Sequence, residues 1–274
     1  MSSSFEDSSD DDEAMQRYAA ARRCEALRGT AMRRADVAAA DVSWAVLAKV
    51  TATGRIMSGL RFWQRPESLE HLIVGANQTI VTGVKPWPAC VGLASVVEQR
   101  GCGGAYAGVR ALELGAGLGV VGILLAKLGA TVTLSDNSPE VLTLLRRNAA
   151  ENCVARATSV AHLAWEQPEA LGMEPESLDL IVGSDLVYGG PKNGELLLSA
   201  INTLISLYGH PGTTVLLAFG CRCRGTDEHV AFLREAACRY GVTRLEPDDA
   251  VAEESGVDGV DIVELRQGVG CERP

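Results

Sequence analysis

Hydrophobic positions follow two different spacings from about residue 109 onward. Short, nearly continuous apolar runs are typical of buried strands, and longer stretches with apolar residues every three or four positions are typical of helices. The short runs predict strands at residues 109–114, 131–136, 157–165, 178–188, 213–220, 242–246 and 260–266. The longer stretches predict helices at residues 119–129, 138–152, 194–209 and 227–241.

The alternation of these elements predicts the fold class. Strands separated by helices form a parallel sheet that is covered on both faces. We therefore predict an α/β fold with a doubly wound, mostly parallel, seven-stranded sheet. The last two strands have no helix between them and are expected to form a terminal antiparallel pair. Another helix should start at Pro88, because proline suits the first helical position.

The first part of the chain has a different composition. Residues 1–13 hold six acidic residues and no basic one, which predicts a disordered acidic tail. Residues 14–40 are rich in Ala and Arg and predict a helix, and residues 71–83 predict a β-hairpin. We expect three parts: the tail, an N-terminal helix and hairpin extension over 14–77, and a main domain over 78–274.

Composition excludes several classes of protein. Lys127 interrupts the longest apolar stretch, so no run reaches the roughly 18 residues that span a bilayer. The N-terminus lacks a signal-peptide pattern, which favours a soluble protein of the cytoplasm or also the nucleus. The eight cysteines are scattered, and no zinc-ligand spacing occurs around Cys221 and Cys223. We expect no metal, no membrane contact and, at a net charge of −10, no basic surface for nucleic acid.

The stretch "LELGAGLG" carries the first sign of a ligand. Gly115, Gly117 and Gly119 lie between a predicted strand and a predicted helix, where doubly wound sheets bind ligands. Their spacing is not the G-x-G-x-x-G of dinucleotide-binding proteins, and the nearby Glu113 would repel a pyrophosphate. Asp136 is placed like an acid that binds ribose hydroxyls. The pattern favours S-adenosylmethionine, a nucleoside with a cationic tail, over NAD; a turn without a ligand is the alternative.

Further motifs follow in order along the chain: "KPWPACVGLA", "LAWE", "GSDLVY" and "DGVDIVELR". Together with the glycine turn they resemble the class I, seven-strand methyltransferases that use S-adenosylmethionine. Within these, they are most similar to the protein-lysine methyltransferases of methyltransferase family 16. The resemblance covers roughly residues 78–266 and implies S-adenosylmethionine as the cofactor.

The resemblance also implies a set of cofactor-binding residues around the glycine turn and the neighbouring strand ends. They are Trp87, Glu113, Gly115, Ala116, Gly117, Asp136, Trp165 and Ser184. In this interpretation Trp87 forms a wall of the pocket and Trp165 covers the adenine. Each tryptophan could instead be a core residue when judged alone.

Asp185 and Tyr188 match the family's Asp-x-x-Tyr signature, which lies beside the transferred methyl group. An attacking lysine must be neutral, although its ordinary pKa is about 10.4. Burial next to a sulfonium lowers that pKa, whereas a carboxylate raises it. We therefore expect Asp185 to orient the amine and Tyr188 to line its channel. The alternatives are a helix cap for Asp185 and a packing aromatic for Tyr188.

These features predict a monomeric enzyme that methylates a protein side-chain amine, most simply a lysine. By resemblance the substrate would be a chaperone, a translation factor or a histone. Arginine methylation, small-molecule methylation and a non-catalytic cofactor-binding protein are the alternatives. Base methylation is disfavoured, because related enzymes carry Asn/Asp-Pro-Pro-Tyr where this chain has Asp-Leu-Val-Tyr. The following Gly189-Gly190-Pro191 matches no particular branch of the family.

Overall fold

The structure, a computed structural model, covers the predicted main domain most completely. It describes residues 42–44, 60, 62–64, 83, 87–101, 103–188, 190–220, 224–245 and 260–268. The predicted acidic tail, the helix at 14–40 and, except for Gly83, the hairpin at 71–83 lie outside the described residues. The predicted division at residue 77 stays a prediction.

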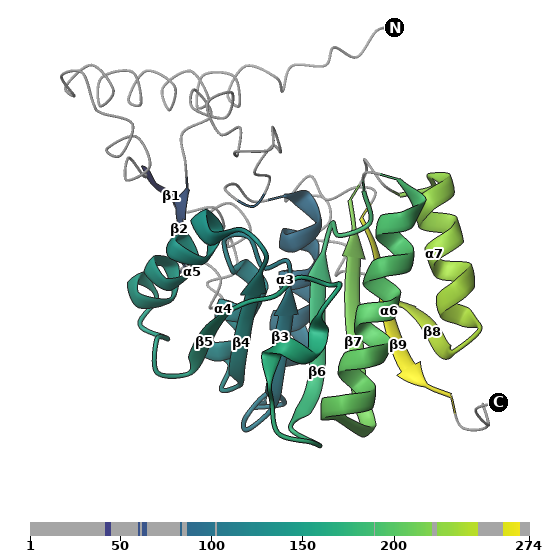
Figure 1. Cartoon of the computed structure of the whole chain (residues 1–274). Helices are drawn as coiled ribbons and strands as arrows, with labels where there is room; N and C mark the ends of the chain where they lie inside the picture. Colours follow the sequence, from purple (N-terminus) through teal and green to yellow (C-terminus); the bar gives the residue numbers. More distant parts are fainter. Residues whose placement is uncertain are drawn as a thin grey trace, which may run out of the picture.

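A seven-stranded sheet forms the centre of the molecule (Figure 1). Its strands are β3 (Arg110–Leu114), β4 (Thr131–Asp136), β5 (Thr158–His162), β6 (Leu178–Ser184), β7 (Gly209–Phe219), β8 (Tyr240–Leu245) and β9 (Asp261–Gln267). Their order is β5-β4-β3-β6-β7-β9-β8. The first five are parallel, and β9 runs antiparallel to both β7 and β8. The predicted doubly wound sheet with a terminal antiparallel pair is confirmed.

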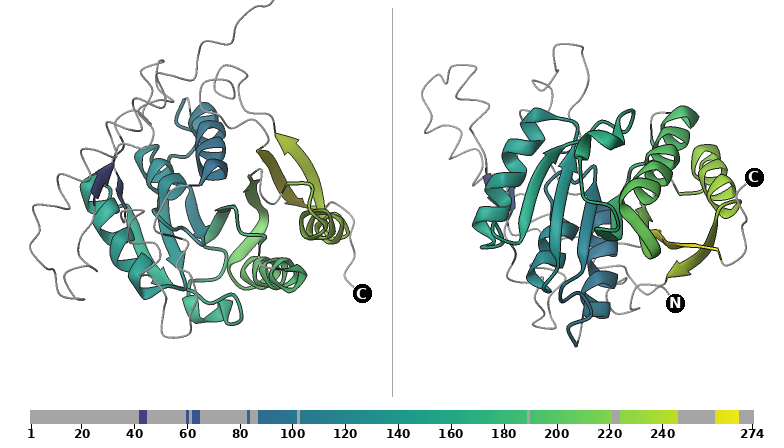
Figure 2. Two further views of the ribbon diagram at one scale, coloured as in Figure 1. Left: turned by 90° about the horizontal axis from the view of Figure 1, so that it is seen from above. Right: turned by 60° about the horizontal axis from the view of Figure 1, so that its bottom comes forward.

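Helices cover both faces of this sheet (Figure 2). They are α3 (Pro88–Gly101), α4 (Val120–Lys127), α5 (Pro139–Glu151), α6 (Pro191–Tyr208) and α7 (Asp227–Ala237). Two core clusters result: α3, α4 and α5 contribute to one, and α6 and α7 contribute to the other. Side chains alternate along a strand, so in β6 Leu180 and Val182 join the first cluster while Ile181 joins the second. A strand buried on both faces is apolar throughout, as the sequence indicated.

Helix α4 lies very close to the sheet. Seven of its residues, from Val120 to Ala126, are buried, so it has no polar face. A Cβ placed on Gly122 would lie 2.3 Å from Leu134 Cδ2 and 2.5 Å from Glu113 Oε2. Only glycine fits at this crossing, because interiors are packed too densely to accept an added methyl group.

The N-terminal extension also contributes to the core. Strands β1 (Val42–Trp44) and β2 (Phe62–Gln64) pair antiparallel. The side chains of Leu60 and Phe62 are fully buried and belong to the same cluster as α4 and α5. Among the described residues, no helix has the length and apolar character to cross a membrane.

The close packing of α4 predicts the effect of a single methyl group. Gly122→Ala should lower the free energy of unfolding by about 1–3 kcal/mol, because the new Cβ overlaps Leu134 and Glu113. Gly194→Ala in α6 is the matched control. A Cβ there meets nothing closer than 3.7 Å, so it should stabilise the helix by up to about 1 kcal/mol. Urea denaturation measures both, and equal stability of the two variants would contradict the packing argument.

Candidate functional site

The candidate site lies where the strand order of the sheet reverses. Strand β3 has β4 on one side and β6 on the other, and Leu114 pairs with Gly183 near the carboxyl ends. Open α/β sheets bind ligands at this switch point. The segments that leave β3 and β6 are therefore neighbours, and they carry the predicted glycine turn and Ser184-Asp185.

The glycine turn after β3 adopts a backbone that favours glycine. Gly115, Gly117 and Gly119 have φ angles of 52°, 53° and 80°, which lie in the left-handed region. The Ala116 N–H donates to the Ser135 carbonyl oxygen (2.8 Å), and the Gly117 N–H donates to Asp136 Oδ2 (3.2 Å). The structure thus brings the turn and the predicted ribose-binding acid together.

Asp136 is held by backbone groups at the end of β4. Its Oδ1 accepts the Ser138 N–H (3.0 Å), and its Oδ2 accepts the Gly117 N–H. Burial raises the pKa of Asp136, although these hydrogen bonds act in the opposite direction. The carboxylate therefore has a defined orientation beside the glycine turn, which is what the recognition of a sugar hydroxyl requires.

Glu113 does not carry the exposed charge that the sequence suggested. Its side chain is 3% exposed, and its Oε2 accepts the Gly122 N–H (2.9 Å) in the first turn of α4. Burial raises the pKa of Glu113 to about 8, because a charged carboxylate is poorly solvated there. Because the Glu113 side chain is directed to α4, the structure does not support the argument that its charge repels pyrophosphate. Direct contact with a cofactor stays a prediction.

Trp165 lies next to the glycine turn. A Cβ on Gly115 would be 3.9 Å from Trp165 Cζ2 and 2.6 Å from Leu186 Cδ2. The indole is half-buried and packs against the core cluster of α6 and α7. Trp165 thus combines the predicted position beside the cofactor turn with the core packing that was its alternative.

The start of α3, a helix of the first core cluster, lies near the ends of β3 and β6. Trp87 directly precedes the helix and is half-buried, and its carbonyl accepts the Cys90 N–H (3.0 Å). Burial, with smaller contributions from Glu113 and Asp185, raises the pKa of the Cys90 thiol to about 12. The start of α3, the end of β3 and the end of β6 therefore converge, which places Trp87 near the predicted pocket.

Gly83 belongs to this site, although sequence analysis did not single it out. A Cβ on Gly117 would lie 3.3 Å from the Gly83 carbonyl oxygen, and a Cβ on Gly83 would lie 3.2 Å from Gly117 Cα. The two backbones are in contact, so Gly83 covers part of the glycine turn. Its position just before "KPW" was the available signal, but it was interpreted as the end of a hairpin.

Asp185 is held tightly at the end of β6. Its φ angle is 53°, which is uncommon for a residue other than glycine and typical of functional sites. Its N–H donates to the Ala218 carbonyl oxygen (2.8 Å), and its Oδ1 accepts the Gly220 N–H (2.6 Å). The left-handed residue ends β6 at Ser184, earlier than the predicted strand 178–188, and directs the carboxylate toward β7.

The structure contradicts two alternatives for these residues. The N-cap of α6 is Gly190, without a side-chain cap, so Asp185 does not cap that helix. Tyr188 is 52% exposed, so it is not a core aromatic. The Asn193 side chain donates to the Tyr188 carbonyl (2.9 Å) and the Leu186 carbonyl (3.1 Å), which fixes the backbone of this segment. Ser184 is half-buried and pairs with Ala218.

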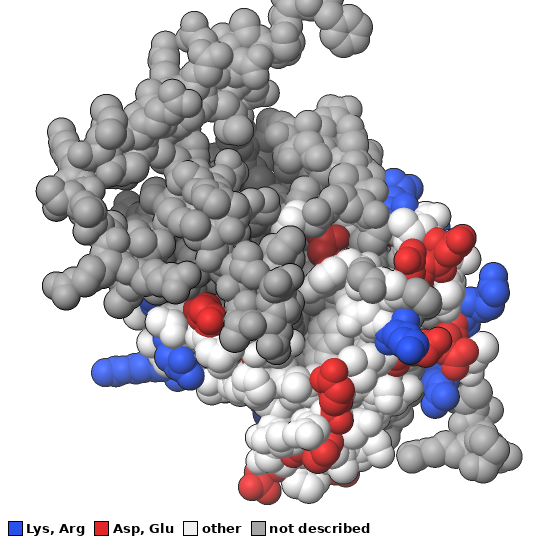
Figure 3. Space-filling view, turned by 45° about the horizontal axis from the view of Figure 1, so that its top comes forward, with Lys and Arg blue, Asp and Glu red and all other residues white. Residues whose placement is uncertain are grey.

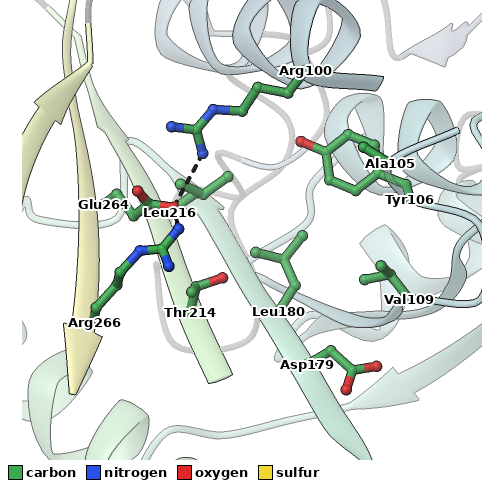
Figure 4. A pocket seen from close by; sticks show the side chains of 10 residues that line it. All are labelled: Arg100, Ala105, Tyr106, Val109, Asp179, Leu180, Thr214, Leu216, Glu264 and Arg266. Carbon is green, nitrogen blue, oxygen red and sulfur yellow. Dashed lines mark hydrogen bonds and ion pairs between the residues drawn. The ribbon is translucent and has the colours of Figure 1, made fainter. Parts of the chain in front are cut away.

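A separate hollow lies against the sheet, away from the predicted site residues. Its volume is about 220 Å³, and Leu180 and Leu216 contribute to its lining (Figure 4). Arg100 and Arg266 both donate to Glu264 Oε1 (3.1 Å each). Although burial raises the pKa of Glu264, these hydrogen bonds bring it below its usual value. Its lining includes residues of β6, β7 and β9 and none of the predicted site residues.

The surface around the carboxyl ends of the strands carries both signs of charge. On the described part of this face, Lys and Arg side chains lie among Asp and Glu side chains, without a continuous basic patch (Figure 3). Within the described ranges, no three His, Cys, Asp or Glu side chains are grouped as metal ligands would be.

The strand order, the left-handed glycine turn and the acid after β4 define a class I methyltransferase fold. A sequence model of the family described as "Lysine methyltransferase" matches residues 70–236, and the chain belongs to this family. It is therefore an S-adenosylmethionine-dependent methyltransferase, and the predicted cofactor is confirmed at the level of the family. The match starts inside the predicted N-terminal extension.

The names of three curated relatives cite different substrates. Protein N-lysine methyltransferase METTL21A of Danio rerio is 36% identical over 59% of this chain and 70% of that protein. EEF1A lysine methyltransferase 3 of Xenopus tropicalis is 34% identical over 42% of this chain and 48% of that protein. Histone-arginine methyltransferase METTL23 of Xenopus laevis is 36% identical over 45% of this chain and 52% of that protein. The chain thus spans about half the length of the last two.

Solved structures resemble the chain more distantly. Magnesium protoporphyrin IX methyltransferase of Synechocystis PCC 6803, with bound SAM, is 17% identical over 72% of this chain and 90% of that chain, with a TM-score of 0.49. The O-methyltransferase of Bacillus cereus in complex with SAH is 18% identical over 67% of this chain and 83% of that chain, with a TM-score of 0.47. Neither likeness bears on the substrate.

The buried carboxyl group of Glu113 predicts a dependence of stability on pH. The folded protein keeps this proton up to a pH of about 8, whereas the ordinary pKa is 4.5. The contribution of Glu113 to stability therefore falls as the pH rises through this range, by up to about 1.4 kcal/mol per pH unit. Glu113→Gln keeps an acceptor for Gly122 and removes the titration. Urea unfolding between about pH 5 and pH 8 should show a smaller decline for the variant; parallel declines would contradict the assignment.

Proposed function

We propose that the protein transfers a methyl group from S-adenosylmethionine to a lysine side chain of a protein substrate. The observation that carries this proposal is the position of Asp185, whose Oδ1 accepts the Gly220 N–H (2.6 Å) at the switch point of the sheet. This carboxylate lies at the end of β6, the strand that pairs with β3 where the glycine turn begins, and it can orient an incoming cationic or hydrogen-bonding amine.

The residues around the switch point fit an adenosine derivative that carries no phosphate. No Lys or Arg occurs between Arg110 and Lys127, so the turn offers no cation for a phosphate. Asp136 would accept the ribose hydroxyls, and the backbone of the glycine turn would lie against the methionine portion. Trp87 and Trp165 would form walls, with Trp165 toward the adenine. When bound, S-adenosylmethionine supplies an electrophilic methyl group on a sulfonium.

The acceptor site is formed by Asp185 and Tyr188. Because an attacking amine must be neutral and a carboxylate favours the ammonium form, we assign Asp185 the alignment of the amine rather than its deprotonation. Precise alignment alone contributes strongly to such a displacement. Tyr188 is exposed at the same strand end, where its ring would border the channel through which the amine enters.

The choice of lysine over arginine rests on the family and on the acceptor segment. The family description and two of the three relatives name lysine. The segment Asp-Leu-Val-Tyr lacks the paired prolines that shape a slot for flat nitrogen groups, which suits a flexible aliphatic amine. Arginine is the second candidate, since a relative that is 36% identical is named a histone-arginine methyltransferase. We propose a translation factor, chaperone or histone as the substrate, in the cytoplasm or also the nucleus.

Labelling of cell proteins tests the substrate class. Incubation of the protein with tritiated S-adenosylmethionine and a cell lysate should label a protein, and mass spectrometry of the labelled peptides should find methyl-lysine. Heat-inactivated protein is the control for enzymes of the lysate. Methyl-arginine would replace the lysine proposal by the second candidate. Label only in small molecules, or no label above the control, would reject a protein substrate.

Conservative variants test the two acceptor-site residues. Asp185→Asn keeps the left-handed backbone, which Asn tolerates, and keeps an acceptor for the Gly220 N–H, but it removes the charge. Asp185→Asn and Tyr188→Phe should each lower kcat by about tenfold or more, with little change in cofactor Kd by calorimetry. Glu195→Gln, an exposed carboxylate at the start of α6, should leave kcat unchanged. Wild-type kcat in both site variants would reject their roles.

A further inference from the structure

A buried histidine lies behind the end of β7. His229, in the first turn of α7, is 3% exposed, and its ring centroid lies 4.6 Å from that of Phe219, the last residue of β7. Its Nδ1 accepts the Gly225 N–H (3.0 Å). The proton of the neutral ring is therefore on Nε2, which lies 3.4 Å from Asp261 Oδ2 and makes no hydrogen bond.

Backbone bonds connect this histidine to the acceptor site. The Arg224 N–H, next to Gly225, donates to the Gly220 carbonyl oxygen (2.9 Å). The Gly220 N–H in turn donates to Asp185 Oδ1 (2.6 Å). His229 is thus connected to the Asp185 carboxylate through Gly225, Arg224 and Gly220.

Helix formation does not require this imidazole. The Thr226 hydroxyl already caps α7 by accepting the His229 N–H (3.3 Å). Packing against Phe219 would be satisfied by an apolar side chain, without leaving a buried nitrogen unpaired. What an apolar side chain could not supply is an acceptor for the Gly225 N–H.

We propose that His229 is a positioning residue for methyl transfer: by accepting the Gly225 N–H it fixes Gly225 and the adjoining Arg224, and the Arg224 N–H in turn holds Gly220, whose N–H bonds to Asp185. This inference rests on the proposed function, and it names the group that maintains the geometry of the acceptor site. His229 acts through the turn and does not touch the substrate.

A dependence on pH follows from the geometry. Protonation of Nδ1 removes the acceptor and places a charge in a buried position. The charged groups that face the ring are Asp261 of β9, Arg244 of β8 and Arg224 of the turn. Burial lowers the pKa of His229; Asp261 opposes this effect, and the two arginines add to it. The anchor is therefore intact above the ordinary histidine pKa of about 6.5 and is lost as the pH falls below it.

Two amide variants separate the two ring nitrogens. The Oδ1 of Asn lies where Nδ1 lies, so His229→Asn can still accept the Gly225 N–H. The amide of Gln reaches instead toward the position of Nε2, so His229→Gln leaves Gly225 without its acceptor. We expect His229→Asn to keep kcat within about threefold of wild type and His229→Gln to lower it by about tenfold, both with unchanged cofactor Kd. The need for a neutral amine lowers kcat of every variant in acid, but below a pH of about 6.5 kcat of the wild type should fall more steeply than that of His229→Asn.

The outcomes distinguish this inference from the proposed function. If the wild type methylates no protein in the labelling experiment, the proposed function is rejected. If the wild type is active, equal kcat in the two variants, or an acid decline of kcat that is equally steep in the wild type and in His229→Asn, rejects the positioning role. Should either variant fail to fold, ¹⁵N NMR of the wild type decides: the Gly225 and Gly220 amide shifts should titrate together with the His229 ring. Amides that do not follow the ring overturn the inference.

Discussion

The close approach of α4 to the sheet is the constraint on which the rest of the site depends. At Gly122 there is no room for a side chain between the helix and Leu134. The Glu113 carboxyl group accepts the N–H of the same residue, Gly122. To enter a helix in that position, the chain must reverse directly after β3, which requires the left-handed backbone of Gly115, Gly117 and Gly119. The turn that faces the candidate pocket is thus a consequence of packing, because dense interiors admit few backbone paths.

A second constraint acts on the neighbouring strand. Asp185 leaves β6 with a left-handed backbone, and both its N–H and its carboxylate bond to the end of β7. The acceptor side of the site therefore depends on the end of β7, and His229 of α7 accepts the N–H of Gly225, which follows that strand.

Local pattern was sufficient to predict the strands, the helices and the glycine turn, since each depends on the spacing of residues close in the sequence. The end of β6 was predicted too late, because the apolar residues Leu186 and Val187 continue the pattern after Asp185 has already turned the chain. Glu113 was placed correctly at the strand end but was interpreted as a charged group beside the ligand. A strand end does not reveal whether its last side chain faces a crevice or the start of the next helix.

By itself, the amino-acid sequence determined the α/β alternation, the glycine turn and the presence of acids at the ends of β4 and β6, since these are properties of residue type and local spacing. Only the tertiary structure decided that Glu113 is buried, that the backbone of Gly83 contacts Gly117, and that His229 accepts the Gly225 N–H. The partners in these contacts are separated along the chain, and their distances and solvation exist only after the sheet and its helices have packed together.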